Sequence, residues 1–315
     1  MDNLRIVFMG TPEFATGILD AIRQAGYEVV AVVTAPDRPA GRGQKLHFSH
    51  VKEYALEHGL PVLQPLNLKD EAFREELAAF QADIQVVVAF RMLPKAIWAL
   101  PPKGTFNLHA SLLPDYRGAA PINWALINGE TATGVTTFFI DEKIDTGAII
   151  LSKETTITHE DNAGTLHDRL MALGKDAVVE TLRRVTDGSV TTTPQPMDDT
   201  GKNAPKLTKE NTRIDWQMSG EAIRNLIRGL SPYPAAWTLF TDAGQEWNVK
   251  IYEAEFEAGA CDHRPGTLVT TKKDLRIAVT DGYLRILSLQ FPGKKKMTVS
   301  ELLNGIRFSE EAFAL

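Results

Sequence analysis

Apolar runs and amphipathic segments alternate along the first third of the chain. Residues 4–10 form a short apolar run, residues 11–26 carry apolar positions at helical spacing, and residues 27–35 form a second run rich in valine. Continuous apolar runs are typical of strands buried on both faces, and a period of 3.6 residues is typical of an amphipathic helix. The first 35 residues are therefore predicted to form a strand, a helix and a strand.

The same alternation continues to residue 109. We expect strands at 61–65, 84–90 and 104–109, with helices near 69–80 and 94–100. Strands that are apolar on both faces and separated by helices favour a parallel sheet between two layers of helices. The predicted fold class of this part is α/β with a mainly parallel sheet.

Further along, a short helix is expected at 121–129, two strands at 133–141 and 147–155, and a long amphipathic helix at about 163–186. The pattern then changes, because residues 189–212 are polar, contain proline and show no periodicity, as a linker does. We place a first domain at 1–188, a linker at 189–205 and a second domain at 206–315. In the second domain, a helix at 219–230 precedes five short strand-like runs, a spacing that favours a small OB-like barrel over a sandwich.

The composition is that of an ordinary globular protein, with 43% hydrophobic and 23% charged residues in a chain of 315. It shows neither a signal peptide nor an apolar run long enough for a membrane span, so we expect a cytoplasmic protein. The formal net charge of −6 argues against indiscriminate binding to nucleic acid. Residues 1–205 carry a net charge of −7 and residues 206–315 a net charge of +1, so a polyanion would meet the second part more easily.

Ligands of open parallel sheets bind outside the carboxyl ends of the strands. The end of the first strand, MGTPEF, lacks the GxGxxG pattern of dinucleotide sites and is interpreted as a tight turn, with Pro12 at the first helical position. The strand at 104–109 ends differently. Asn107 and His109 are two residues apart and point to the same face of the sheet, where both can hydrogen-bond an oxygen that gains negative charge during acyl transfer. The alternative is a polar pair that merely caps a strand edge.

The residues that follow extend this candidate site. Ser111, Leu112, Leu113 and Pro114 form an apolar turn whose backbone groups we expect to be free, so it is suited to holding one edge of a flat heteroaromatic molecule. A carboxylate from the loop between the next two strands could orient the imidazole and take part in proton transfer. The spacing leaves three alternatives open in that loop: Asp141, Glu142 and Asp145.

The stretch of sequence that begins at Asn107 matches a known signature. The stretch NLHASLLPDYRGAAPINWALINGE resembles the signature of enzymes that use 10-formyltetrahydrofolate, and the whole chain is similar to the methionyl-tRNA formyltransferase family. Matching stretches are FMGTPEFA, TAPDRPAGRGQKL, the DxxxDTG pattern at 141–147 and KLTKENTRIDW. The resemblance implies a Rossmann-like catalytic domain followed by an OB-like domain.

The same resemblance implies the site and its substrates. Catalysis falls to Asn107, His109 and Asp145, folate binding to the turn from Ser111 to Pro114, and no metal is required. The formyl donor would be 10-formyltetrahydrofolate and the acceptor methionyl initiator tRNA. Separately from the resemblance, we expect the protein to be a monomer. Two departures affect the folate pocket: Phe90 and Arg91 stand where the family usually has Tyr and Gly, and Lys143 stands where it has Gly.

Basic residues are the candidates for tRNA contacts. Residues 38–52 carry four cations and no acid, and the stretch follows the second strand, so it leaves the sheet at the edge of the candidate site. A solvated loop is the alternative, but the resemblance implies tRNA recognition through Arg42 and Lys45. Lys206 and Lys209 in the second domain are further candidate phosphate contacts. The rival functions are formylation of glycinamide ribonucleotide or an amino sugar nucleotide, hydrolysis of 10-formyltetrahydrofolate, and RNA binding without catalysis.

Overall fold

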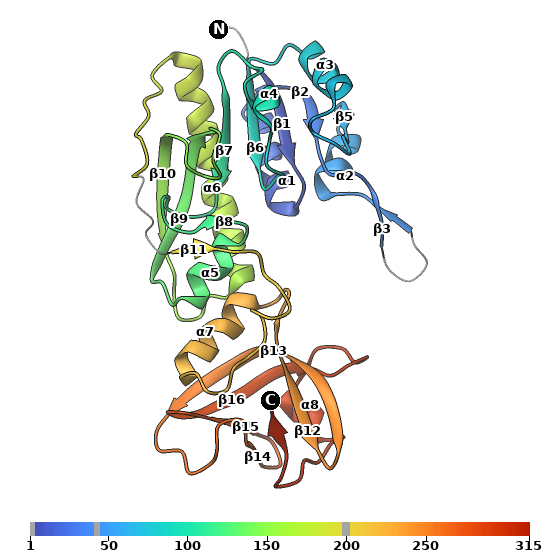
Figure 1. Ribbon diagram of the computed structural model, residues 1–315, viewed down its shortest axis with the longest axis vertical. Helices are drawn as coiled ribbons and strands as arrows, with labels where there is room; N and C mark the ends of the chain where they lie inside the picture. The colour runs from blue at the N-terminus through green and yellow to red at the C-terminus, as the bar shows by residue number, and fades with distance from the viewer. Residues whose placement is uncertain (1–3, 41–44, 197–201) are drawn as a thin grey trace. The chain divides into compact units, whose positions relative to one another are not determined.

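The computed structural model describes residues 4–40, 45–196 and 202–315, and the chain divides into two compact units (Figure 1). The first unit contains residues 1–121, 132–155 and 167–203. The second contains residues 122–131, 156–166 and 204–315. Two internal segments that precede residue 167 therefore belong to the second unit.

A seven-stranded sheet forms the centre of the first unit, in the order β10-β9-β7-β6-β1-β2-β5. The five strands from β7 to β5 run parallel, and β9 is antiparallel to β7. The prediction of a mainly parallel sheet is therefore confirmed. The strand bounds are β1 Arg5–Gly10, β2 Glu28–Val33, β5 Val62–Leu63, β6 Ile84–Val88, β7 Thr105–His109, β9 Ala132–Phe139 and β10 Ile149–Thr156.

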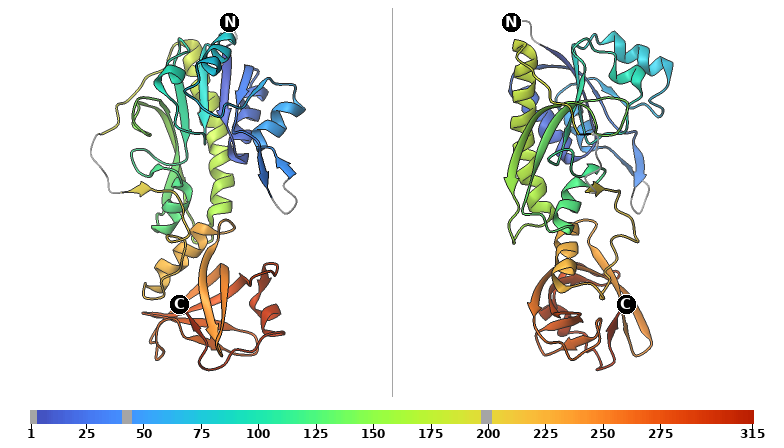
Figure 2. Two further views of the ribbon diagram at one scale, coloured as in Figure 1. Left: turned by 45° about the vertical axis from the view of Figure 1, so that its right-hand side comes forward. Right: turned by 60° about the vertical axis from the view of Figure 1, so that its left-hand side comes forward.

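Helices cover both faces of this sheet (Figure 2). On one face α1 and α6 touch each other, since a Cβ at Gly17 would lie 2.6 Å from the sulfur of Met171. On the other face α3 and α4 pack against a cluster that includes Val7, Met9 and Val87. The helix bounds are α1 Glu13–Gln24, α3 Glu71–Ala79, α4 Lys95–Trp98 and α6 Ala163–Asp187. Helix α5, Pro121–Ile127, belongs almost entirely to the second unit.

Two local predictions need correction. Pro12 is the N-cap of α1 and not its first helical residue, because its ψ of 175° is extended. The basic stretch at 38–52 is not a simple loop. It contains a hairpin of β3 (Arg38–Ala40) and β4 (Lys45–His47), followed by α2 (His50–Glu57), which begins where the Ser49 hydroxyl accepts a hydrogen bond from the backbone N–H of Lys52.

Part of the segment expected to act as a linker pairs with the sheet. Thr193 and Ile149 exchange two backbone hydrogen bonds of 2.8 Å, so the chain runs antiparallel to the start of β10 there. Further on, the backbone N–H of Tyr116 donates to the carbonyl of Lys202 at 2.6 Å. The short strands β8 (Arg117–Gly118) and β11 (Asn203–Ala204) form a small two-stranded sheet.

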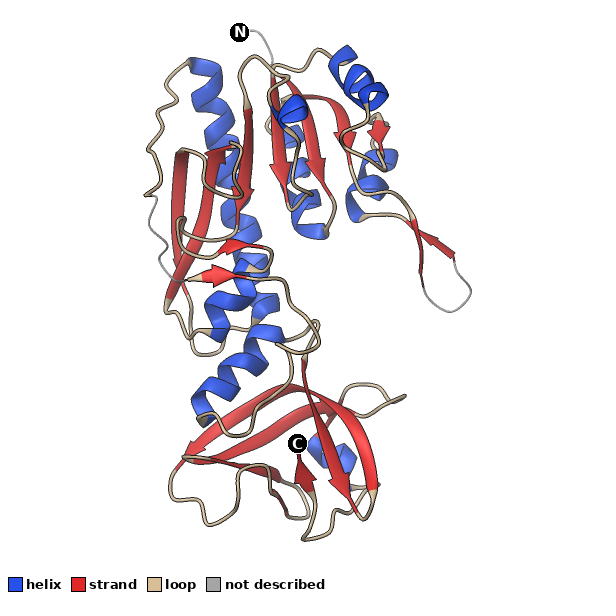
Figure 3. Ribbon diagram, viewed as in Figure 1, coloured by secondary structure: helices blue, strands red, loops and turns tan. Residues whose placement is uncertain are grey.

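Antiparallel strands make up most of the second unit (Figure 3). Their order is β14-β15-β16-β13-β12-β18, and a bridge between Thr267 and Phe313 links the two ends of this series into a nearly closed barrel. The predicted barrel and all five of its expected strands are therefore present. The bounds are α7 Gly220–Leu230, β12 Ala236–Asp242, β13 Gln245–Ala258, β14 Leu268–Thr270, β15 Leu275–Val279, β16 Gly282–Gln290, β17 Met297–Thr298, α8 Val299–Leu303 and β18 Phe313–Ala314.

The barrel interior and one face of α7 form a single apolar core that contains Ile223, Ile227, Phe240 and Leu284. Alternation along β16 explains how the strands build it, since every second residue from Gly282 to Ser288 is buried. Helix α7 begins at Ser219, whose hydroxyl accepts from the backbone N–H of Ala222. An Asp, Asn, Ser or Thr cap of this kind typically contributes about 1 kcal/mol to a helix.

Candidate active site

The carboxyl end of β7 places the two predicted donors together. Asn107 pairs with Val87 of β6 and with Phe138 of β9, so its side chain lies on the face that carries α3 and α4. His109 follows on the same face and is only 6% exposed. Within the described residues, the Asn107 amide makes no side-chain hydrogen bond, which leaves it available to a ligand.

One nitrogen of His109 is already engaged. Its Nε2 lies 2.8 Å from the carbonyl oxygen of Tyr116, which can only accept, so Nε2 carries a hydrogen and donates. The other nitrogen, Nδ1, lies 3.9 Å from Oδ2 of Asp145. Nδ1 can therefore donate only when the imidazole is charged, and can accept a proton when it is neutral.

Only one of the three acidic alternatives comes close to this imidazole in the described part of the chain. Asp141 accepts from the backbone N–H of Lys143 and from the hydroxyl of Thr146, at 2.9 and 2.8 Å. Glu142 forms an exposed ion pair with Lys95 at 2.6 Å, and this hydrogen bond lowers the pKa of its carboxyl. Asp145 is largely buried and faces His109, which agrees with the role that the resemblance implies for it.

The backbone around His109 and Asp145 adopts an uncommon conformation. Tyr116, whose carbonyl holds His109, has a φ of 60°, and Asp145 has a φ of 54°. Such left-handed conformations cost roughly 1–3 kcal/mol for residues other than glycine, and they persist where the surroundings enforce them. The Asp145 carboxylate is fixed by the backbone N–H of Gly118, which donates to Oδ2 at 3.0 Å.

The turn from Ser111 to Pro114 is partly used by the protein itself. The Thr136 hydroxyl donates to the Ser111 carbonyl at 2.7 Å and accepts from the Leu113 backbone N–H at 3.2 Å. The expectation that the backbone groups of this turn are free is therefore wrong for these two. Ser111 and Leu113 are buried, whereas Leu112 and Pro114 are half-exposed and present the accessible apolar surface.

The departures from the family pattern have local explanations. Arg91 donates to the carbonyls of Pro65 and Leu66, at 2.8 and 3.3 Å, and thereby ties the ends of β5 and β6 together. Burial and the nearby Arg38 both lower the pKa of its guanidinium. Lys143 is not among the described residues with positive φ, so replacing glycine there causes no backbone strain.

The candidate tRNA contacts are distributed over both units. Arg42 lies outside the described residues, as does the side chain of Lys45. Lys206 and Lys209 are exposed on the second unit. The ammonium of Lys209 lies 5.3 Å and the guanidinium of Arg213 lies 5.5 Å from the centre of the Trp237 ring, so two cations share one half-exposed aromatic surface.

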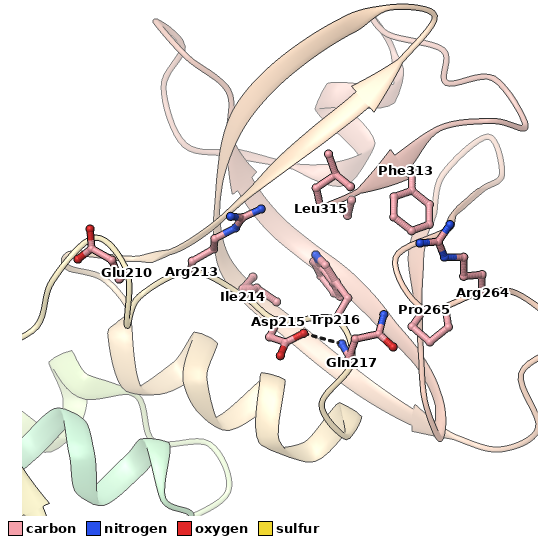
Figure 4. A pocket seen from close by; sticks show the side chains of 11 residues that line it. Glu210, Arg213, Ile214, Asp215, Trp216, Gln217, Arg264, Pro265, Phe313 and Leu315 are labelled. Carbon is pink, nitrogen blue, oxygen red and sulfur yellow. Dashed lines mark hydrogen bonds between the residues drawn. The ribbon is translucent and has the colours of Figure 1, made fainter.

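A pocket of about 430 Å³ opens beside these cations in the second unit (Figure 4). Its wall combines the guanidinium groups of Arg213 and Arg264 with apolar surface from Trp216 and Phe313. It contains none of the predicted catalytic or folate-binding residues. No group of His, Cys, Asp and Glu suited to a metal ion occurs in the described residues, and no helix among them is long and apolar enough to cross a membrane.

Sequence reasoning missed the groups that hold His109, Asp145 and the turn from Ser111 to Pro114 in place. Tyr116 and Gly118 act through backbone atoms, and Thr136 lies on a strand distant in sequence. The YRG triplet, which follows the turn after one intervening residue and contains the two residues of β8, was the available signal.

Comparisons with known proteins agree with this fold. A family model described as formyl transferase matches residues 4–182, and a model described as formyl transferase, C-terminal domain, matches residues 206–307. A methionyl-tRNA formyltransferase from Flavobacterium johnsoniae is 61% identical over 312 residues, which cover 99% of both chains. One from Bacteroides fragilis is 51% identical over 314 residues, covering 98% of this chain and 97% of the relative.

Solved structures show the same fold at lower identity. HypX from Aquifex aeolicus in complex with tetrahydrofolic acid aligns with a TM-score of 0.65 at 18% identity, covering 98% of this chain and 49% of HypX. An N-formyltransferase from Helicobacter canadensis in complex with folinic acid and dTDP-3-aminofucose aligns with a TM-score of 0.66 at 20% identity, covering 90% and 98%. The chain, matched along nearly its whole length by two successive family models, belongs to the formyl transferase family.

Proposed function

We propose that this protein transfers the formyl group of 10-formyltetrahydrofolate to the α-amino group of methionyl initiator tRNA. Relatives named methionyl-tRNA formyltransferase, 46–61% identical over nearly the full chain, support the acceptor. The folate ligands bound in two solved structures of this fold support the donor. The observation that carries the proposal is that Asn107 and His109 share one face at the end of β7 and that Asp145 faces His109.

In the proposed reaction the amine nitrogen forms a bond to the formyl carbon, the bond from that carbon to N10 of the folate breaks, and one amine proton moves to N10. The Asn107 amide donates to the formyl oxygen as it gains negative charge. The His109 imidazolium donates from Nδ1 to the same oxygen, since Nε2 is held by Tyr116. Asp145 faces that nitrogen and accepts the amine proton before it passes to N10.

The turn after the donors holds the folate in this proposal. Leu112 and Pro114 supply apolar contact, and Ser111 and Leu113 keep the turn in place through Thr136. The catalytic part is assigned to residues 1–188 and the tRNA-binding part to 206–315, joined by 189–205, in a monomer. Arg42, Lys45, Lys206 and Lys209 contact tRNA phosphates.

An acceptor panel tests this function. Wild type and His109→Ala are assayed for formyl transfer from 10-formyltetrahydrofolate to methionyl initiator tRNA, to glycinamide ribonucleotide, and without an acceptor. We expect transfer to the tRNA alone, with kcat at least about a hundredfold lower in the variant, as loss of an oxyanion donor typically causes. Formate release without an acceptor would identify a hydrolase, and tRNA binding without any turnover would identify an RNA-binding protein.

The tRNA contacts are tested by salt dependence. Each phosphate contact adds about one unit to the slope of log affinity against log salt. We expect Lys206→Ala and Lys209→Ala each to lower this slope by about one unit and to weaken the binding of all tRNAs to the same extent. The matched control is Lys272→Ala, which removes an exposed cation shortly after the end of β14. An unchanged slope in the first two variants would show that Lys206 and Lys209 are not part of the interface.

A further inference from the structure

The segment predicted to be a linker, residues 189–205, contacts the candidate active site. Gln195 lies in that segment, yet its amide nitrogen donates to the carbonyl of Asp145 at 3.0 Å and to the carbonyl of Gly147 at 2.8 Å. Its amide oxygen accepts from Nη2 of Arg117 at 2.6 Å and from Nε at 3.2 Å. The side-chain amide of Gln195 thus binds the Asp145 loop through its nitrogen and Arg117 through its oxygen.

Arg117 completes the arrangement. Its Nε also donates to the Asp145 carbonyl at 3.0 Å, so that oxygen accepts from Arg117 and Gln195 together. A carbonyl has two lone pairs, and both are satisfied here. These bonds fix the peptide group of Asp145, which is the residue with the left-handed backbone in the loop.

The residues on either side of Arg117 hold the side chains of His109 and Asp145 in place. Tyr116 accepts the hydrogen bond from Nε2 of His109, and Gly118 donates to the carboxylate of Asp145. Arg117 lies between them and binds the backbone of the Asp145 loop. Three consecutive residues therefore hold the imidazole, the loop and the carboxylate, and Gln195 joins this triplet to the loop.

The position of Gln195 is itself fixed by the backbone. Two residues earlier, Thr193 exchanges hydrogen bonds with Ile149. These contacts, together with those of the amide, belong to one compact unit of the chain. The stretch is therefore anchored beside the catalytic loop and does more than connect two domains.

From these contacts we infer that Gln195, together with Arg117, is a positioning residue that sets the distance between Asp145 and His109. Neither side chain touches the reacting atoms. They act through the Asp145 backbone, because a shift of that peptide would move the carboxylate relative to Nδ1. A misplacement of about 1 Å at a catalytic group can lower a rate by about a hundredfold. The inference rests on the proposed function, in which Asp145 takes part in proton transfer.

The test compares kcat and KM for matched variants of the full chain. Gln195→Ala is expected to lower kcat about 10- to 100-fold, with the KM values for tRNA and folate changed by less than about twofold. Gln195→Glu keeps the size and the acceptor for Arg117 but cannot donate to the two carbonyls, so we expect a similar loss. Thr192→Ala, exposed in the same segment, is the control and should match wild type in kcat and Tm.

A double-mutant cycle separates positioning through Asp145 from a general structural role. In an Asp145→Ala background, Gln195→Ala should change kcat by less than about twofold, because the group that it positions is gone. The inference is overturned if Gln195→Ala alone behaves like Thr192→Ala, or if its loss persists undiminished in the Asp145→Ala background. If Asp145→Ala itself leaves kcat intact, the proposed mechanism fails instead, which keeps the two failures distinguishable.

Discussion

Strands β1 and β7 run in the same direction and end at the same edge of one sheet, but their ends differ. Beyond β1 the protein fills the space itself. A Cβ at Gly10 would lie 2.6 Å from the Cβ of Ala15 and 3.0 Å from the carbonyl oxygen of Val88. At the end of β7 lie Asn107, with no side-chain hydrogen bond among the described residues, and His109, with one nitrogen facing Asp145.

This difference shows how a strand end can be interpreted. A glycine at such an end invites comparison with a phosphate loop, but at β1 it is required by close packing. The half-exposed amide of Asn107 has no internal hydrogen-bond partner among the described residues, so it adds little to stability. In the proposed function the formyl donor is the partner of this amide, so the two strand ends should respond oppositely to mutation.

The largest effect is expected at β7. Asn107→Ala removes a donor to the formyl oxygen and should lower kcat about 10²- to 10³-fold. The free energy of unfolding should stay within about 1 kcal/mol of wild type, because no internal hydrogen bond is broken. Steady-state formyl transfer and urea unfolding measure the two quantities, and a large loss of stability would mean that Asn107 serves the fold.

The reverse outcome is expected at β1. Gly10→Ala introduces a methyl group into a filled space and should lower the free energy of unfolding by about 1–3 kcal/mol, with kcat of the folded enzyme retained. Gly259→Ala is the matched control, because a Cβ there meets nothing within 4 Å. Equal stability of the two variants in urea would contradict the packing explanation.

The smallest effect is expected beyond β2, the strand next to β1, where Asp37 pairs with Lys52 at 2.5 Å. The hydrogen bond from Lys52, followed by that from Gln64, lowers the pKa of the Asp37 carboxyl below its ordinary value. A carboxyl with a lowered pKa in the folded state stabilises the protein above its unfolded pKa of about 3.9, and this contribution is lost as the pH falls further.

Asp37→Asn should therefore lower Tm slightly at pH 7, and the difference from wild type should shrink below about pH 4. Thermal unfolding of both proteins between pH 7 and pH 3 measures this trend. A difference that is independent of pH would show that the charge of Asp37 contributes nothing.

Long apolar strands and strongly periodic helices were predictable from the sequence. Strands β1, β2 and β6 are apolar on both faces, and the regular spacing in α6 extends over 25 residues. The two-residue strands β8, β11, β17 and β18 carry no periodicity and were missed. Helix α2 was also missed, because its eight residues bury only Val51 and Ala55 and follow a basic, glycine-rich stretch.

The site was predictable only where side chains on one regular element converge. Asn107 and His109 follow from the alternation of a strand. The choice among Asp141, Glu142 and Asp145 does not, because loop residues have no fixed direction, and only the resemblance selected Asp145. The contacts of Gln195 were beyond prediction, since they depend on a non-periodic segment returning to the sheet.

Asp145 has a left-handed backbone conformation, so selection for stability and selection for activity should favour different residues at this position. Asparagine tolerates this conformation better than most residues, keeps the size of the side chain and can still accept from Gly118. A library selected for heat resistance should therefore enrich asparagine at position 145, because it removes a largely buried charge at no conformational cost. A library selected for growth that depends on formyl transfer should retain aspartate, so the two enrichment ratios at this one position would diverge.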